Sequence, residues 1–88
     1  MITANLIDHH SGTGTLRVLD NGHTVSELDF RPNESGPNAG SLMGTANHLL
    51  PDLGYELAYG WMDERESEEG TVYSGRAVRL GDRTDTWD

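Results

Sequence analysis

Hydrophobic and polar residues alternate along much of residues 1–30, which is the pattern of strands with one covered face. Residues 2–8, ITANLID, alternate weakly and precede the turn-forming HHSGTG. Residues 15–30, TLRVLDNGHTVSELDF, hold two alternating segments around Asn21 and Gly22, the pair that most readily adopts a type I′ hairpin turn. The pattern therefore predicts a first strand, a loop and a hairpin.

The two-residue turn sets the pairing of this hairpin and places Val18 opposite Val25. Leu28 and Phe30 then fall on the other face from Val25, which leaves two interpretations. Either both faces of the hairpin are partly covered, or a bulge near residues 26–27 shifts the phase. We expect the bulge.

A helix is predicted after the turn-rich residues 31–40, RPNESGPNAG. Asn38 or Ser41 would cap its start and Pro51 would end it. Two glycines make this helix marginal alone, so we expect it to pack on the sheet. Its apolar residues recur at helical spacing: Leu42, Met43, Ala46, Leu49 and Leu50.

Residues 55–62, YELAYGWM, fit either a strand or a helix. A helix running on to Gly70 would place four glutamates at its negative C-terminal end, which is unfavourable. We therefore predict a strand followed by an acidic loop. Residues 71–80, TVYSGRAVRL, read as the hairpin partner of that strand, with a bulge at Ser74–Gly75.

These elements predict one small α+β domain over residues 1–80, followed by a polar tail over residues 81–88. About five antiparallel strands are expected, in the order three strands, one helix and two strands, with the helix packed on the sheet. The OB-fold has the same order of elements, although no residue motif supports that family here. Both an open sheet and an OB-like barrel fit the pattern.

Charge narrows the range of partners. The chain has 15 acidic residues, six Arg and a formal net charge of −9. Such a chain repels nucleic acid and anionic lipid and attracts cationic partners. No apolar run approaches the ~18 residues of a membrane span, and no signal peptide is evident, so a cytoplasmic protein that binds neither membrane nor nucleic acid is expected.

The densest acidic stretch is residues 63–69, DERESEE. If it is extended, alternate glutamates project to one side about 6.6–6.8 Å apart, a spacing that suits the mimicry of phosphates. Repulsion at that separation is only ~0.6 kcal/mol in water, so a solvated hairpin loop is the competing interpretation. The candidate partner-binding acids are Asp63, Glu64, Glu66, Glu68 and Glu69, with Asp82 and Asp85.

An aromatic stripe precedes these acids: Tyr55, Leu57, Tyr59 and Trp61. It is either core or an exposed protein-binding face in which rigid rings are rimmed by charge. We include Tyr59 and Trp61 among the candidate partner-binding residues.

Other chemistry finds little support in the sequence. There is no Cys, the adjacent His9 and His10 point to opposite faces of any strand, and no spaced His pair exists, so no metal site is predicted. The glycine-rich loops lack the Lys of a phosphate-binding loop, and no nucleophile elbow is present. We predict neither a cofactor nor an enzyme activity.

The sequence thus favours a non-enzymatic acidic protein, monomer or homodimer, that binds a basic, nucleic-acid-handling protein and blocks its nucleic-acid site. Anti-CRISPR, anti-restriction and nuclease-immunity proteins of phages and plasmids have this size and charge. Two alternatives are a haloadapted domain, whose acids serve solvation, and an OB-like domain that binds a peptide or small ligand through its aromatic sheet face.

Overall fold

Three antiparallel strands begin the chain, as the alternation predicts. In the computed structural model, which describes residues 1–32 and 41–80, they are β1 (Ile2–Asp8), β2 (Gly14–Asp20) and β3 (His23–Phe30). Asn21 and Gly22 join β2 to β3 with φ angles of 53° and 87°, the positive values that the predicted turn requires.

The predicted bulge in this hairpin is confirmed, and the predicted pairing of Val18 with Val25 is wrong. The register shifts between Val18 and Leu19, so Val18 lies opposite Ser26 and Val25 is the extra residue. Val25 is 50% exposed, whereas Phe30 packs against the core. The extra residue shifts the alternation of β3 by one position, so that Phe30 lies on the face that packs against the core.

The helix α1 (Leu42–Leu49) begins at Ser41, whose Oγ accepts a hydrogen bond from the amide of Gly44 at 3.0 Å. The alternative cap, Asn38, lies outside the described residues. Pro51 does not continue the α-helix but stands in the first turn of a 3₁₀ helix, η1 (Leu50–Leu53), where its missing N–H has no cost.

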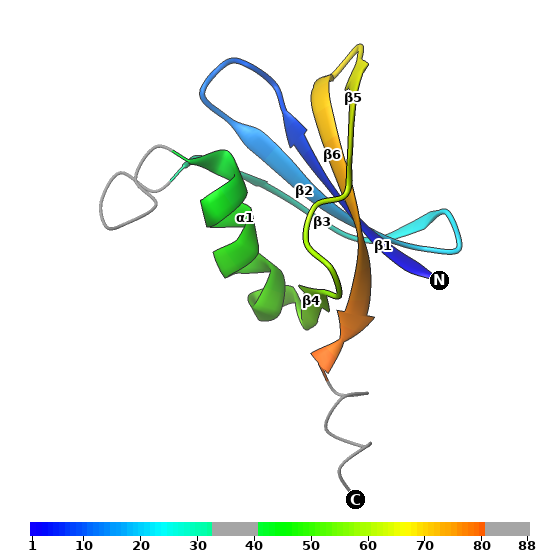
Figure 1. Ribbon diagram of the computed structural model, residues 1–88. Helices are drawn as coiled ribbons and strands as arrows, with labels where there is room; N and C mark the ends of the chain where they lie inside the picture. Colours follow the sequence, from blue (N-terminus) through cyan, green and yellow to red (C-terminus); the bar gives the residue numbers. More distant parts are fainter. Residues whose placement is uncertain (33–40, 81–88) are drawn as a thin grey trace, which may run out of the picture.

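Strand β6 (Gly70–Arg79) is the longest strand and organises the rest of the sheet. It pairs with β1 on one side, and on the other with β4 (Tyr55–Leu57) and β5 (Asp63–Ser67) in succession. The sheet runs β3-β2-β1-β6-β4, with β5 also on β6, and its edges do not meet (Figure 1). The predicted order of elements is confirmed, and the OB-like barrel is wrong because the sheet stays open.

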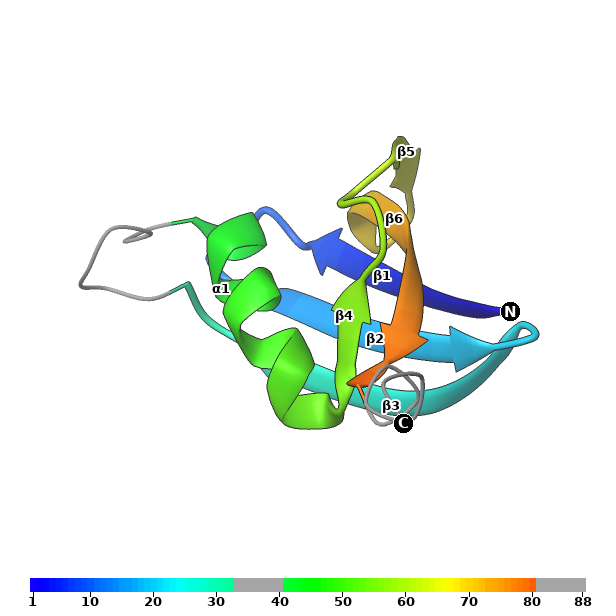
Figure 2. The same ribbon diagram turned by 60° about the horizontal axis from the view of Figure 1, so that its bottom comes forward.

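One face of the sheet carries α1 and the main core (Figure 2). The helix contributes Ala46, and Leu50 follows it into the same cluster. No helix in residues 1–32 or 41–80 is long and apolar enough to cross a membrane. The buried sheet residues of the cluster are Ala4, Leu6, Leu16, Val18 and Ala77.

Two further predictions about residues 55–80 are corrected. Residues 63–67 form a strand, not a loop, because they pair with β6 over five positions. The expected bulge at Ser74–Gly75 is absent, since β6 pairs with β1 without a break there. The irregularity lies across from it, in residues 58–62, where the carbonyl of Gly60 approaches Gly75 so closely that an added Cβ would be 2.5 Å away.

Candidate functional site

Strand β5 is an edge strand in which all five residues, Asp63–Ser67, are exposed. It forms a hairpin with the first half of β6 that projects beyond α1 at one end of the molecule (Figure 1). Among the described residues, no strand pairs with its outer edge. The most acidic stretch of the sequence is therefore held in an extended, accessible conformation.

Carboxylates gather on one face of this hairpin. Glu64 lies opposite Tyr73. Two pairs further along, Thr71 lies between Glu66 of β5 and Asp8 of β1, and is opposite both. Partial burial of the Tyr73 phenol raises its pKa, and the negative charges of Glu64, Asp8 and Glu66 raise it further. We call Asp8, Glu64 and Glu66 the acidic triad.

The acidic triad is fixed in part by a buried hydroxyl. Thr71 is only 4% exposed and donates a hydrogen bond to Oε1 of Glu66 at 2.8 Å. Because its one proton is used there, Thr71 accepts from Nε2 of His10, also at 2.8 Å. The backbone amide of His10 in turn donates to Oδ1 of Asp8 at 2.9 Å. His10 and Thr71 thus connect two of the three carboxylates.

Glu69, in the turn of the hairpin, contacts Arg17 and His9. Nη2 of Arg17 lies 3.5 Å from Oε2 of Glu69, and Nδ1 of His9 lies 2.8 Å from the backbone carbonyl of Glu69. The pKa of Arg17 is raised, mainly by its side-chain hydrogen bond to Glu27 against the effect of burial, with Glu69 contributing less. Glu69 is therefore engaged by a cation of the protein itself.

The remaining predicted site residues divide between surface and core. Tyr59 is 74% exposed, whereas Trp61 is half-buried, packs against the core and donates from Nε1 to Oδ1 of Asn47 at 3.0 Å. Glu68 is exposed in the turn. Asp82 and Asp85 lie outside the described residues. Among the residues of the aromatic stripe, Tyr59 is the most exposed.

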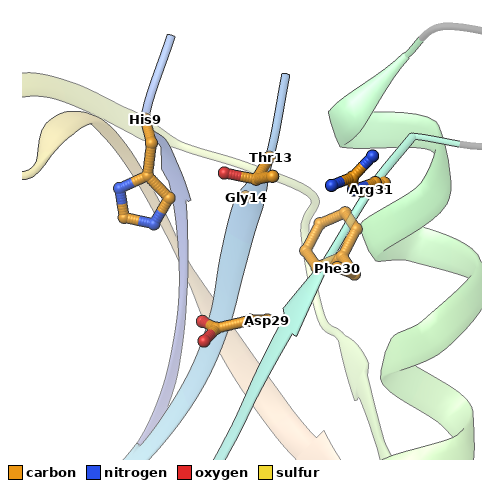
Figure 3. Close-up of a pocket in the computed structure, with 6 residues that line it drawn as sticks. All are labelled: His9, Thr13, Gly14, Asp29, Phe30 and Arg31. Atoms are coloured by element: carbon orange, nitrogen blue, oxygen red, sulfur yellow. The ribbon is translucent and has the colours of Figure 1, made fainter. Parts of the chain in front are cut away.

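A pocket of about 330 Å³ lies where residues at the end of β1, the start of β2 and the end of β3 come together (Figure 3). His9 and Asp29 both face it, and Oγ1 of Thr15 links them, at 2.7 Å from Nε2 of His9 and 2.7 Å from Oδ1 of Asp29. Thr13, Gly14, Phe30 and Arg31 complete its lining. Sequence reasoning did not find this network, since its members are up to 20 positions apart and no motif joins them.

No group of three or more His, Asp or Glu side chains in the described ranges is placed to hold a metal ion. Comparison with family models, with curated proteins and with solved structures finds no match to this chain. The surface of the molecule is therefore the basis on which function is inferred.

Proposed function

We propose that this protein is a non-enzymatic inhibitor that binds a basic, nucleic-acid-handling protein through the acidic face of β5 and so blocks the partner's nucleic-acid site. The observation that carries this proposal is the exposed edge strand whose Glu64 and Glu66 project to one side beside Asp8. Carboxylates in this position compete with phosphates for Arg and Lys side chains.

The spacing of the carboxylates supports the proposal. Residues two apart in a strand project from the same face about 6.8 Å apart, which is close to two steps, measured along the helix axis, between the phosphates of one DNA strand. The pairing of Glu66 with the buried Thr71 holds one of these carboxylates in place. A carboxylate that is already ordered loses less conformational entropy when a partner binds.

Apolar side chains beside the acids support a protein rather than a small cation as the partner. Tyr59 is 74% exposed and Met62 is 64% exposed, in the segment that leads directly into β5. Met62 and Asp63 also line a shallow groove of about 220 Å³, but Asp63 and its partner Ser74 lie on the face opposite to Glu64 and Glu66, so this groove is not part of the acidic face. Apolar anchors rimmed by charge are the usual composition of a protein interface, in which the charges mainly steer the approach.

The test is affinity capture from the source organism with the wild-type protein and two double variants. Glu64→Gln with Glu66→Gln removes two charges from β5. Asp20→Asn with Asp52→Asn removes two charges at the other end of the molecule, where Asp20 lies opposite Ile2 and Asp52 is exposed in η1. Thermal unfolding confirms that both variants are folded.

We expect the first variant to bind the captured partner about ten-fold more weakly and the control variant to bind it nearly normally. Binding should also weaken as salt rises, and the protein should displace nucleic acid from the partner. Equal capture by both variants, or a partner that handles no nucleic acid, would contradict the proposal. A protein that unfolds when salt is removed would instead favour the haloadapted domain.

A further inference from the structure

The outer edge of β5 exposes a defined set of backbone groups. The turn between β5 and β6 has two residues, so Ser67 and Gly70 form the hydrogen-bonded pair that closes the hairpin. Hydrogen-bonded and non-hydrogen-bonded pairs alternate along an antiparallel ladder. The amides and carbonyls of Glu64 and Glu66 therefore point away from β6, toward solvent.

The edge of β5 differs from the opposite edge of the sheet. Strand β3 contains the bulge at Val25, which interrupts its ladder and twists the strand, a common protection against pairing with another chain. Strand β5 pairs with β6 over five consecutive residues without a register shift. Its outer edge therefore offers a regular template for an added strand.

Side-chain charge alternates in sign along this template. Glu64 and Glu66 project to the face that carries Tyr73, and Arg65 projects to the opposite face, beside Val72. In an added strand, the residues directly opposite share the same face, so their charges interact across the pair. The favourable order in the partner is basic, acidic, basic, and it is the same for a parallel or an antiparallel strand.

We propose that β5 binds its partner by β-strand addition, and that the occupant is an extended segment with Lys or Arg at alternate positions and Asp or Glu between them. This inference rests on the proposed function and adds the mode of binding and the sequence pattern of the bound segment. Main-chain hydrogen bonds to Glu64 and Glu66 supply the docking, and the alternating charges select the segment.

A second copy of the same chain is a poor occupant of this edge. A symmetric antiparallel pair centred on Arg65 places Arg65 opposite its own copy and Glu64 opposite Glu66. Centring the pair on Glu64 or on Glu66 places that glutamate opposite itself. Each symmetric register thus brings like charges into direct cross-strand contact, which is destabilising.

The experiment uses blocked synthetic peptides and follows the backbone amides of the full-length protein by NMR. The first peptide contains Thr-Lys-Glu-Lys-Thr, and the second contains Thr-Lys-Lys-Glu-Thr, with the same composition and charge but without the alternation. A third repeats the first with N-methyl groups on the amides of both Lys residues and of the central Glu, which removes the donors that would face β5 in either strand direction while the charges remain.

We expect the first peptide to shift the amides of Glu64 and Glu66 most strongly and to bind about ten-fold more tightly than the second, and the N-methylated peptide to lose this binding. In an Arg65→Glu variant, a peptide with Lys at the centre should become the preferred ligand. Equal binding of all three peptides, or no binding of the first, would overturn strand addition.

The outcomes separate this inference from the proposed function. If the captured partner depends on Glu64 and Glu66 but the rearranged and N-methylated peptides bind as well as the first, the acidic surface acts by charge alone and strand addition is wrong. If the alternating peptide binds as expected while capture is unaffected by the glutamates, the edge accepts strands but the proposed inhibitor function is wrong.

Discussion

The close approach of Gly75 to the segment before β5 allows a quantitative test of the fold. A Cβ at residue 75 would lie 2.5 Å from the carbonyl oxygen of Gly60 and 3.0 Å from Cδ2 of Leu57. Atoms of this kind approach to about 3.5 Å, so the Gly60 carbonyl must retreat by roughly 1 Å in a Gly75→Ala variant. Two hydrogen bonds lie on either side of Gly60 in the sequence. The amide of Ala58 donates to the carbonyl of Arg76 at 2.9 Å, and the amide of Met62 donates to the carbonyl of Ser74 at 2.8 Å.

Overpacking of this kind typically costs about 1–3 kcal/mol, and the loss of glycine's freedom in the unfolded chain returns about 0.4–1 kcal/mol. We expect Gly75→Ala to lower the free energy of unfolding by about 1–2 kcal/mol, which lowers the midpoint of thermal unfolding by roughly 5–15 °C for a domain of this size. Circular dichroism with thermal and urea denaturation measures both quantities.

The neighbouring substitution Arg76→Ala is the control, because Arg76 is exposed on the same strand and should change stability by no more than about 0.5 kcal/mol. If Gly75→Ala unfolds at the wild-type temperature, the contact between Gly60 and Gly75 does not hold the segment between β4 and β5 as described.

Two further predictions concern the acidic triad. Thr71→Val should lower the free energy of unfolding by about 0.5–1.5 kcal/mol, because Val fills the same space but loses the hydrogen bonds to Glu66 and His10, which are exposed and can bond water instead. Urea denaturation measures this, and an unchanged midpoint would show that the hydroxyl is dispensable. The pKa of Tyr73 is raised in the folded protein, so the folded protein holds the phenolic proton more tightly than the unfolded chain does. The resulting contribution to stability is complete below about pH 10 and is lost as the pH rises through the pKa of Tyr73 in the folded protein. The wild type should therefore lose more stability than Tyr73→Phe as the pH rises above about 10, and identical pH profiles would contradict the partial burial of this phenol beside the carboxylates.

Local signals were sufficient for most of the elements. The Asn21-Gly22 pair fixed the first hairpin because its positive φ angles are a property of those residue types. The side chain of Ser41 and the ring of Pro51 set the limits of α1 for equally local reasons. The choice of strand over helix for the segment that begins at Tyr55 is also confirmed, and it followed from the unfavourable position of the glutamates at a helix C-terminus.

Features that depend on distant residues could not be read from the sequence. Alternation alone predicts a strand over residues 55–62, whereas β4 ends at Leu57, where the chain leaves the ladder before Gly60 contacts Gly75, 15 positions away. The hydrogen bond that joins His10 to Thr71 connects residues 61 positions apart. The acids of β5 were identified as candidates, but the addition of Asp8 to them depends on the pairing of β1 with β6.

The central claim is that the outer edge of β5 is the surface that a basic partner covers. Amide hydrogen exchange of the protein, alone and in complex with the captured partner, tests it at individual residues. The amides of Glu64 and Glu66 should exchange rapidly in the free protein and become strongly protected in the complex, while that of Arg65, which faces β6, changes little. A stable complex in which Glu64 and Glu66 still exchange as fast as in the free protein would contradict the account.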